Sequence, residues 1–282
     1  MSTRVLTAQA ASRARHKRQR VRGESAPEAE PAQDKEFMST LAKGFAVLRL
    51  FGRERPSLTL SEAAAATELS RATARRILRT LSSLGYVEQR GRLFSLAPGI
   101  LNLGFSYLSA QSWIERARPL MKELSERFHE SCSAAILQGT EVAYVARVPA
   151  GRIMSVAISI GTRLPAFHTS IGRAQLGFLD DEEIWRRLRS LRIEPYTPST
   201  IIDAQALFER IRADREQGFS IVDEELERGL RSIAVPIVDR TKQAIAALNL
   251  STHSTRTTRN EMRERFLPAL RGVSDLISVT LP

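Results

Sequence analysis

The front of this chain is organised around residues 58–96, which read LTLSEAAAATELSRATARRILRTLSSLGYVEQRGRLFSL. Thr59 and Glu62 form an S/T-x-x-E pattern, in which each side chain satisfies a free backbone N–H group of the other residue at a helix start. The alanines that follow favour a helix and leave room for a second helix to pack closely. A short helix is therefore predicted to begin at Thr59.

A second helix is predicted to start at Ser70, whose hydroxyl is suited to cap it, and to end at Gly85, which tolerates the left-handed conformation common after a helix. The apolar residues of this helix share one face: Ala74, Ile77, Leu78, Leu81 and Leu84. The opposite face carries Arg75, Arg76, Arg79 and Ser82. A cationic helix entered through a small polar turn fits the major groove of DNA, with its N-terminal residues closest to the base edges.

Residues 86–96 alternate well enough for two short strands around a basic tip, QRGR at 89–92. Arginines at such a tip would contact phosphates, which positions a protein on DNA without reading sequence. Two helices, a glycine stop and a basic hairpin predict a winged helix-turn-helix. The side chains expected to contact DNA are Ser70, Arg71, Thr73, Arg75, Arg76, Arg79, Arg90 and Arg92. The alternative is an ordinary solvated helix face and loop.

The charge of the chain is concentrated near its front. The net charge is +11 over 282 residues. Residues 37–98 hold ten Lys/Arg against four Asp/Glu, a net charge of +6, whereas residues 99–282 hold 24 against 22, a net charge of +2. A basic front attracts a polyanion and makes its affinity fall with salt.

Residues 1–36 are expected to form a disordered arm, because a basic stretch and then an acidic one lack apolar periodicity. The arm would add phosphate contacts, or it is a solvated tail or the product of a misassigned start codon. The remaining segments are a DNA-binding domain at 37–98, a linker helix at 99–112 and a second domain at 113–282. No apolar run approaches the roughly 18 residues that span a bilayer. With no signal-peptide core at the N-terminus, a cytoplasmic location is expected.

Three further helices are predicted, one at the start of the DNA-binding domain and two after it. Residues 37–51 form an amphipathic helix with Leu41, Phe45, Leu48 and Phe51 on its inner face. Residues 100–110 form another, opened by Pro98 and Gly99, with an apolar stripe of Leu101, Phe105 and Leu108. A third begins at Pro119 and ends near His129, with Leu120, Leu124 and Phe128 inward.

The second domain is predicted to be an α/β sensor domain with a mainly antiparallel sheet. Its expected strands are residues 132–137, 142–148, 153–160, 219–222, 232–238 and 244–250. Helices are expected after Thr169, after Asp180 or Asp181, from Asp203 to Gln217, and from the Thr258–Glu261 capping box to about Ser278, with a kink at Pro268. The single cysteine, Cys132, is predicted to be a small buried hydrophobic residue.

Catalytic and metal motifs are absent from the sequence. The four histidines are scattered, and there is no G-x-S-x-G elbow, P-loop or G-x-G-x-x-G. We therefore expect no enzyme, no cofactor and no metal site. Ser170 and His168 with a distant aspartate leave a hydrolase as a remote alternative.

The segments LTLSEAAAATELSRATARRILRTLSSLGYVEQ and RLFSLAPGILNLGFSYL resemble the N-terminal domain of the IclR family of bacterial transcriptional regulators. GTRLPAFHTSIGRA, DEELERGLRSIAVPIVD and AIAALNLSTH resemble its effector domain. The resemblance, over residues 39–280, implies an α+β fold in which a winged helix-turn-helix is joined by a linker helix to a C-terminal α/β (GAF-like) effector-binding domain. Glu68 stands where the family commonly has glycine, so a positive φ with some strain is expected there.

The resemblance also implies an effector pocket at Ser170, Ile171, Asp223, Ser232, Asn249 and Ser251. The alternative for the last three residues is sheet packing and turn hydrogen bonding. The start of the helix near Thr169 would suit a carboxylate, and Arg163, Arg231 or His253 are candidates to neutralise one. In the family, the linker helix is part of the dimer contact; the alternative is packing against its own domain.

GLRSIAVPIVD and ALNLSTH are closest to the subgroup that controls aromatic-acid catabolism through the β-ketoadipate pathway, the protocatechuate and 4-hydroxybenzoate regulators. This implies an aromatic or dicarboxylic acid effector, a homodimer or tetramer, and an imperfectly palindromic operator. A second domain that serves only assembly is the competing interpretation. The sequence does not encode whether the regulator activates or represses.

Overall fold

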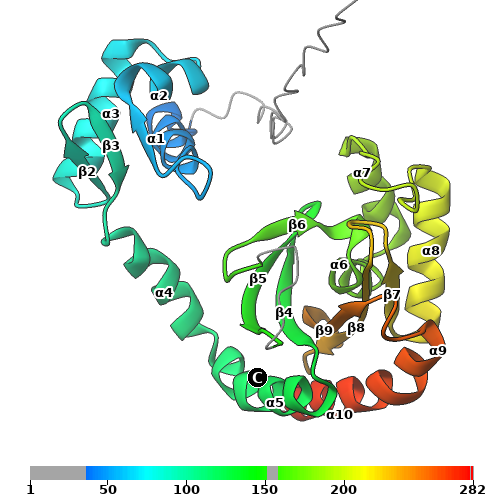
Figure 1. Ribbon diagram of the computed structural model, residues 1–282. Helices are drawn as coiled ribbons and strands as arrows, with labels where there is room; N and C mark the ends of the chain where they lie inside the picture. Colours follow the sequence, from blue (N-terminus) through cyan, green and yellow to red (C-terminus); the bar gives the residue numbers. More distant parts are fainter. Residues whose placement is uncertain (1–35, 151–157, 280, 282) are drawn as a thin grey trace, which may run out of the picture. The chain divides into compact units, whose positions relative to one another are not determined.

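The computed structural model describes residues 36–150, 158–279 and 281. The predicted arm therefore lies outside the described residues, except for Glu36. The first folded part contains α1 (Ser39–Arg49), β1 (Ser57–Thr59), α2 (Leu60–Ala66), α3 (Arg71–Ser83), β2 (Val87–Arg90) and β3 (Leu93–Leu96) (Figure 1). The strands pair antiparallel in the order β1-β3-β2. This is the predicted winged helix-turn-helix.

Local sequence signals set the limits of these helices. Thr59 caps α2, accepting a bond from Glu62 N at 3.3 Å while its own N–H donates to the Glu62 carboxylate at 2.8 Å. Ser70 Oγ caps α3 by accepting from Thr73 N at 3.2 Å. Gly85 has φ +76° and Glu68 has φ +55°. Both predicted capping motifs are confirmed, and so is the left-handed backbone at Glu68.

Two predictions about this core are wrong. Leu41 and Phe45 of α1 are 57% and 49% exposed, and Val47 is the buried residue of that helix. Residues on two faces of α1 are apolar, and its periodicity does not show which face meets α3. Leu84, predicted inward, is 63% exposed because it caps the C-terminus of α3 and lies beyond the packed turns.

α4 (Ile100–Ala110) has the predicted limits, and none of its residues is buried. α5 (Ser112–Phe128) begins earlier than predicted, and Pro119 lies within it. Pro119 removes one helical hydrogen bond, but Trp113, Ile114 and Ala117 are buried ahead of it. The packing of these three side chains holds the first turns of α5 in place.

The second folded part is built on one antiparallel sheet in the order β6-β5-β4-β9-β8-β7. Its strands are β4 (Ser131–Gln138), β5 (Glu141–Val148), β6 (Arg163–Pro165), β7 (Ser220–Asp223), β8 (Leu230–Val238) and β9 (Ala244–His253). The predicted strand at 153–160 falls partly outside the described residues, and residues 158–160 form no strand. The chain turns at Gly161, with φ +87°, so residues after the turn pair with β5 instead.

Helices cover both faces of this sheet (Figure 1). α5 and α10 (Leu267–Val279) bury one face, where Cys132 is fully buried as predicted and burial raises the pKa of its thiol. The other face is covered by the 3-10 turn η1 (Ala166–His168), α6 (Ser170–Leu176), α7 (Asp181–Ser190) and α8 (Ala204–Gln217). At the capping box predicted near the C-terminus, α9 (Arg259–Glu261) continues into a π-helical segment (Met262–Phe266), which ends two residues before Pro268. None of the described helices is long and apolar enough to cross a membrane.

Candidate DNA-binding surface and effector pocket

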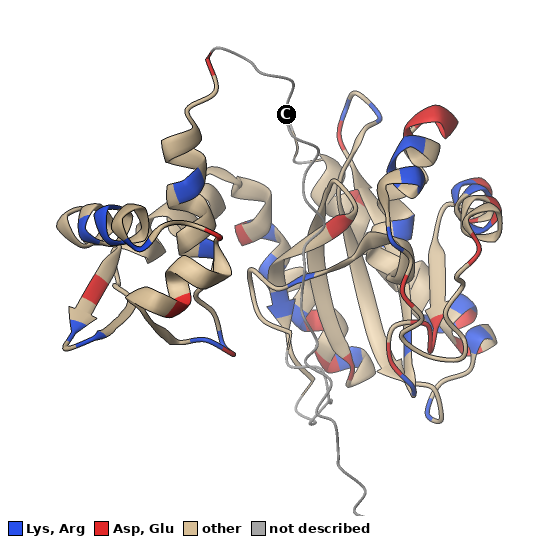
Figure 2. Cartoon of the chain, turned by 90° about the horizontal axis from the view of Figure 1, so that it is seen from above, with Lys and Arg blue, Asp and Glu red and all other residues tan. Residues whose placement is uncertain are grey.

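The solvent face of α3 is cationic. Arg71, Arg75, Arg76 and Arg79 are all exposed, while Ala74, Ile77, Leu78 and Leu81 are buried on the opposite face. Within the described residues, none of these four guanidinium groups has an ion pair or hydrogen bond. Figure 2 shows how basic and acidic positions are distributed over the chain. The four groups are free to meet phosphates or base edges.

Ser70 and Thr73 have a structural task at the start of α3. Ser70 Oγ lies 2.9 Å from Thr73 Oγ1, in addition to accepting from the Thr73 backbone. Their hydroxyls therefore fix the entry of the helix first. Contact with DNA would come on top of this capping role.

The two wing arginines differ. Arg90 lies 3.2 Å from the Glu88 carboxylate, so its charge is partly compensated. Arg92 is exposed and has no such partner in the described part of the chain. Gly91 between them has φ +62°, and the Gln89 side chain donates to its carbonyl at 2.8 Å. Arg92 is the freer phosphate contact.

A small cavity lies beneath η1 and α6, on their side of the sheet. Its volume of about 30 Å³ holds roughly two water molecules. Its polar lining comes from β4, β5, β8 and β9 and from the η1–α6 segment: Ser131, Tyr144, Arg147, His168, Thr169, Ser232, Asn249 and Ser251. An aromatic acid would have to displace some of the lining side chains to enter.

The structure brings three of the six predicted pocket residues to this cavity: Ser232, Asn249 and Ser251. Asn249 Nδ2 donates to Ser251 Oγ at 3.2 Å, which also agrees with the turn-type alternative for this pair. Ser170 is not among the described lining residues, but its hydroxyl donates to Ser232 Oγ, which lines the cavity, at 2.8 Å.

The other two predicted pocket residues have different surroundings. Ile171 is fully buried in the apolar cluster under α6. Asp223 is absent from the described lining, and its carboxylate pairs with Arg231 at 2.7 Å and Arg259 at 2.8 Å. These arginines hold the pKa of Asp223 below its ordinary value against the opposing effect of burial.

None of the three candidate cations for an effector carboxylate lies among the described lining residues. Arg163 binds Glu141 and Gln138, and Arg231 binds Asp223. His253 is exposed, with Nδ1 2.8 Å from Thr255 Oγ1. Each of these side chains is engaged outside the cavity.

Among the described lining residues, Arg147 of β5 carries the permanent positive charge, and sequence reasoning missed it. It is half-buried, has no carboxylate partner in the described part of the chain, and burial lowers the pKa of its guanidinium. Next to it, burial raises the pKa of Tyr144 to about 12, which keeps the phenol neutral. The available signal was an arginine inside the apolar run YVARV, because a buried charge needs a partner.

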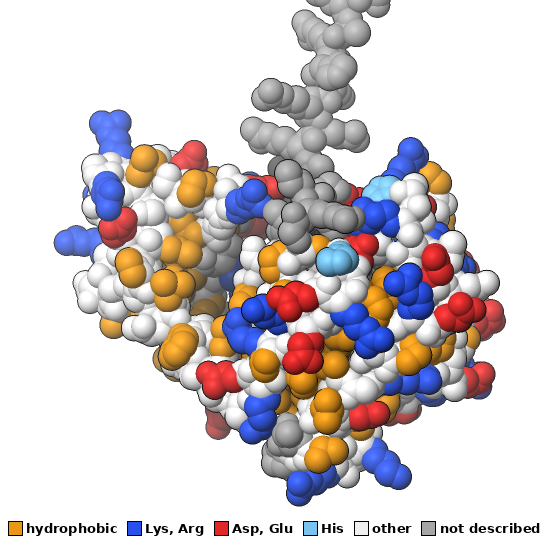
Figure 3. All heavy atoms as spheres, turned by 60° about the horizontal axis from the view of Figure 1, so that its bottom comes forward, with side chains coloured by type: hydrophobic (Ala, Val, Ile, Leu, Met, Phe, Trp, Pro, Cys, Tyr) orange, Lys and Arg blue, Asp and Glu red, His pale blue; other side chains and the backbone are white. Residues whose placement is uncertain are grey.

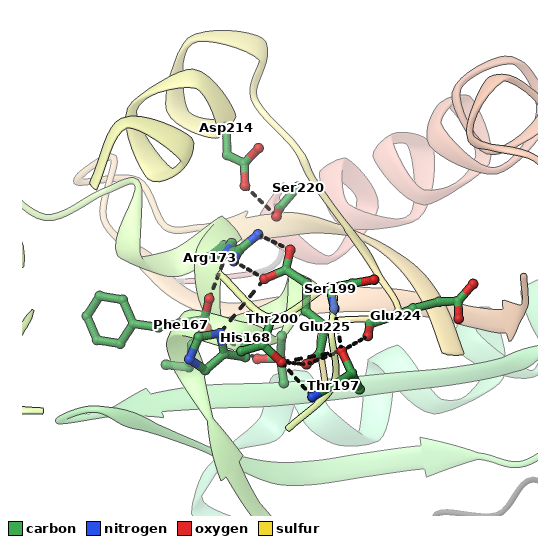
Figure 4. A network of polar contacts seen from close by, with 12 residues as sticks. Phe167, His168, Arg173, Thr197, Ser199, Thr200, Asp214, Ser220, Glu224 and Glu225 are labelled. Carbon is green, nitrogen blue, oxygen red and sulfur yellow. Dashed lines mark hydrogen bonds and ion pairs between the residues drawn. The ribbon is translucent and has the colours of Figure 1, made fainter. Parts of the chain in front are cut away.

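A buried network borders the cavity (Figure 4). Arg173 is fully buried, donates from Nη1 to Glu225 Oε1 at 2.7 Å and from Nε to the Phe167 carbonyl at 2.7 Å. The hydroxyls of Thr197 and Thr200 donate to the backbone carbonyls of Glu224 and Glu225, at 2.6 Å each. The loop after β7 is thereby fixed to α6.

The helix that was expected to offer a carboxylate site is only seven residues long, and Thr169 Oγ1 accepts from Gly172 N at its start. The side chain of Arg147 is the stronger candidate for an anion. The hydrolase alternative needs Ser170 activated by His168, but the Ser170 hydroxyl donates to Ser232. No group of three or more His, Cys, Asp or Glu side chains in the described residues could hold a metal ion.

Comparison with known proteins places both folded parts. The C-terminal domain profile of the bacterial transcriptional regulator IclR matches residues 105–279, and the IclR helix-turn-helix profile matches residues 40–91. The Pca regulon regulatory protein of Pseudomonas putida is 43% identical over 86% of this chain and 83% of its own length. The p-hydroxybenzoate hydroxylase transcriptional activator of Acinetobacter baylyi is 32% identical over 87% and 93%.

The solved structures similar to this chain include complexes with an aromatic acid, of which one is 28% identical. It is the inducer-binding domain of a double mutant of the PobR transcription factor from Acinetobacter, in complex with 3-hydroxybenzoic acid. It covers 58% of this chain and 97% of its own length, and superposes with a TM-score of 0.56.

Proposed function

The chain belongs to the IclR family of bacterial transcriptional regulators, and we propose that it controls genes of aromatic-acid breakdown in response to a small carboxylic acid that binds beside Arg147. The observation that carries the proposal is a half-buried guanidinium without a carboxylate partner in the described part of the chain, in a cavity lined by Ser232, Asn249 and Ser251. The effector carboxylate would supply the missing partner. An aromatic acid or an intermediate of the β-ketoadipate pathway has the required group.

The DNA-binding half of the proposal rests on α3 and the wing. Two copies of α3 would occupy the half-sites of an imperfect palindrome, in a homodimer or tetramer, because two-fold operators mirror two-fold proteins. The exposed apolar residues of α1 and α4, together with the residue that precedes α1, suit such an assembly: Met38, Leu41, Phe45, Leu101 and Phe105. Figure 3 shows hydrophobic side chains at the surface among charged ones.

We propose that the chain consists of a DNA-binding domain at 37–98, a linker helix at 99–112 and an effector-binding and oligomerisation domain at 113–282. Effector binding would shift the balance between arrangements that do and do not suit the operator. We place this activity in the cytoplasm, together with the DNA. The second domain would bind its acid without transforming it.

The DNA half is tested by gel shifts with Arg75→Ala and Arg76→Ala on a fragment from upstream of the regulated genes. Both variants should bind more weakly and with altered sequence preference. Unchanged affinity and preference would remove α3 as the recognition helix.

The effector half is tested by calorimetry of candidate acids against Ser232→Ala and Asn249→Ala. An acid that binds the native protein should also raise its melting temperature. If an acid binds but neither substitution changes its affinity, the effector pocket lies elsewhere. A protein that binds DNA and no acid would support a second domain that serves only assembly.

A further inference from the structure

Two side chains that line the cavity have polar atoms without hydrogen-bond partners among the residues that the structure describes. Both ring nitrogens of His168 and Oδ1 of Asn249 lack hydrogen-bond partners among the described residues. The residues are 1% and 4% exposed, and both line the cavity. A buried polar atom without a partner costs about 1–3 kcal/mol, so in native proteins such atoms normally meet a ligand or a water molecule.

The protein holds the His168 ring without using up its hydrogen bonds. Nδ1 lies 3.8 Å from Glu225 Oε2, which is within ion-pair range but too long for a hydrogen bond. Arg173 already occupies both oxygens of that carboxylate. The ring also meets Tyr196 edge-on, at 5.5 Å between centroids. Glu225 and Tyr196 therefore hold the ring in position, while both ring nitrogens remain available for a hydrogen bond with a bound molecule.

The unsatisfied atoms of His168 and Asn249 restrict which chemical group could form hydrogen bonds with them. A neutral imidazole has one donor nitrogen and one acceptor nitrogen, and either nitrogen can carry the proton. A side-chain amide has a donor NH2 group and an acceptor oxygen. A hydroxyl both donates and accepts, so it complements either arrangement. A carboxylate only accepts and brings a negative charge.

The charges around the cavity argue against a second carboxylate. Among the described lining residues, Arg147 is the one with a permanent positive charge. A second carboxylate near His168 would lie close to the negative Glu225, whose charge Arg173 already balances. The cavity therefore matches one carboxylate and one uncharged polar group.

We infer that His168 is a specificity-determining residue which, together with Asn249, binds a hydroxyl group of the effector, and that the effector is a hydroxylated monocarboxylic acid. This inference rests on the proposed effector site beside Arg147 and narrows it. It selects the hydroxylated aromatic acids from the proposed range and disfavours the dicarboxylic ones.

The test is calorimetry of the full-length protein with benzoate, the three hydroxybenzoate isomers and adipate. The best hydroxybenzoate isomer should bind at least about 10-fold more tightly than benzoate, because a site built to bond a hydroxyl rejects the analogue that lacks it. In His168→Phe this preference should fall to about 2-fold or less. Benzoate itself should lose little affinity, and His253→Phe, a change at an exposed histidine outside the cavity, should keep the full preference.

Other outcomes separate this inference from the proposed function. If adipate binds more tightly than every hydroxybenzoate, or if the hydroxyl preference survives in His168→Phe, the inference is overturned while the effector site beside Arg147 stands. If wild-type protein shows no hydroxyl preference, water alone satisfies His168 and the inference is equally overturned. If none of these acids binds, both proposals fail. The wild-type ligand series decides the question even if His168→Phe does not fold.

Discussion

The recognition surface on α3 and the interior beside α6 both use arginine, but in opposite environments. Arg75 and Arg76 are exposed and unpaired within the described residues, whereas Arg173 is fully buried and holds Glu225 through two hydrogen bonds. Water and salt screen exposed charges, so α3 attracts any polyanion and gains selectivity only at base edges. A buried charge interacts more strongly with its partner, and removing that partner strongly destabilises the fold.

Arg147 lies between these extremes: it is half-buried, and it has no carboxylate partner among the described residues. A protein tolerates such a group when a ligand completes it, because a buried unpaired charge is costly. The comparison therefore predicts three different responses to the loss of an arginine: unfolding, loss of the effector, or weaker DNA binding.

The largest effect is expected for Arg173→Ala. Removing one partner of a buried ion pair leaves Glu225 uncompensated and should lower the free energy of unfolding by about 3–5 kcal/mol. Urea unfolding at pH 7.5 measures the change. Arg186→Ala, which removes an exposed arginine that pairs with Glu183, is the control and should change the free energy of unfolding far less. Equal effects in the two variants would contradict the contrast between buried and exposed arginines.

The second-largest effect is expected for Arg147→Ala, and it should fall on effector binding instead of on folding. Losing the partner of the effector carboxylate should weaken acid binding by about 2–4 kcal/mol, as for other desolvated charge pairs. The variant should remain as stable as wild type, because none of the described carboxylates loses a partner. Calorimetry measures the affinity, with Arg163→Ala as the control. An Arg147 variant that binds the acid normally would exclude this guanidinium as the anion site.

Arg75→Ala and Arg76→Ala should each weaken operator binding by about 1–3 kcal/mol if they reach base edges. Arg92→Ala should weaken binding to all sequences alike and reduce the salt slope by about one, since it would contact a phosphate. Fluorescence anisotropy at several salt concentrations measures both effects. Arg90→Ala should have a smaller effect, because Arg90 is partly compensated by Glu88. The reverse order of Arg90 and Arg92 would refute the assignment of the wing.

The smallest effect is expected for Asp214→Asn, near Arg173 in the buried network. Burial raises the pKa of Asp214 from 3.8 to about 6, although the Ser220 hydroxyl donates to it at 2.6 Å. The folded protein therefore bears the cost of ionising this carboxylate above pH 6, and the cost disappears as the pH falls toward 4.

Asp214→Asn should accordingly stabilise the protein by about 1 kcal/mol at pH 7.5. Each unit by which burial raises the pKa of Asp214 corresponds to at most about 1.4 kcal/mol of stability. The gain should disappear near pH 4. Urea unfolding of both proteins at the two pH values measures it. A gain that does not depend on pH would show that ionisation of Asp214 is not its source.

The elements whose signals are local were predictable from the sequence. The Thr59 and Ser70 caps, the Gly85 stop and the Pro98–Gly99 start fix α2, α3 and α4 to within a residue or two, because each signal acts within one helical turn. Local patterns also predicted where most strands lie along the chain, and the family resemblance predicted the left-handed backbone at Glu68. The family resemblance added the placement of Ser232, Asn249 and Ser251 in one pocket.

Tertiary contacts fixed what these local patterns left open. Which face of α1 is buried, and whether Pro119 starts or interrupts α5, depended on the packing of Val47 and Trp113 against distant elements. Charge pairing is equally non-local: Glu225, the partner of Arg173, lies 52 residues away along the chain. Arg163, Arg231 and Arg147 look alike in the sequence. Only the folded chain shows that the first two pair with carboxylates, whereas Arg147 lines the cavity and has no such partner in the part of the chain that the structure describes.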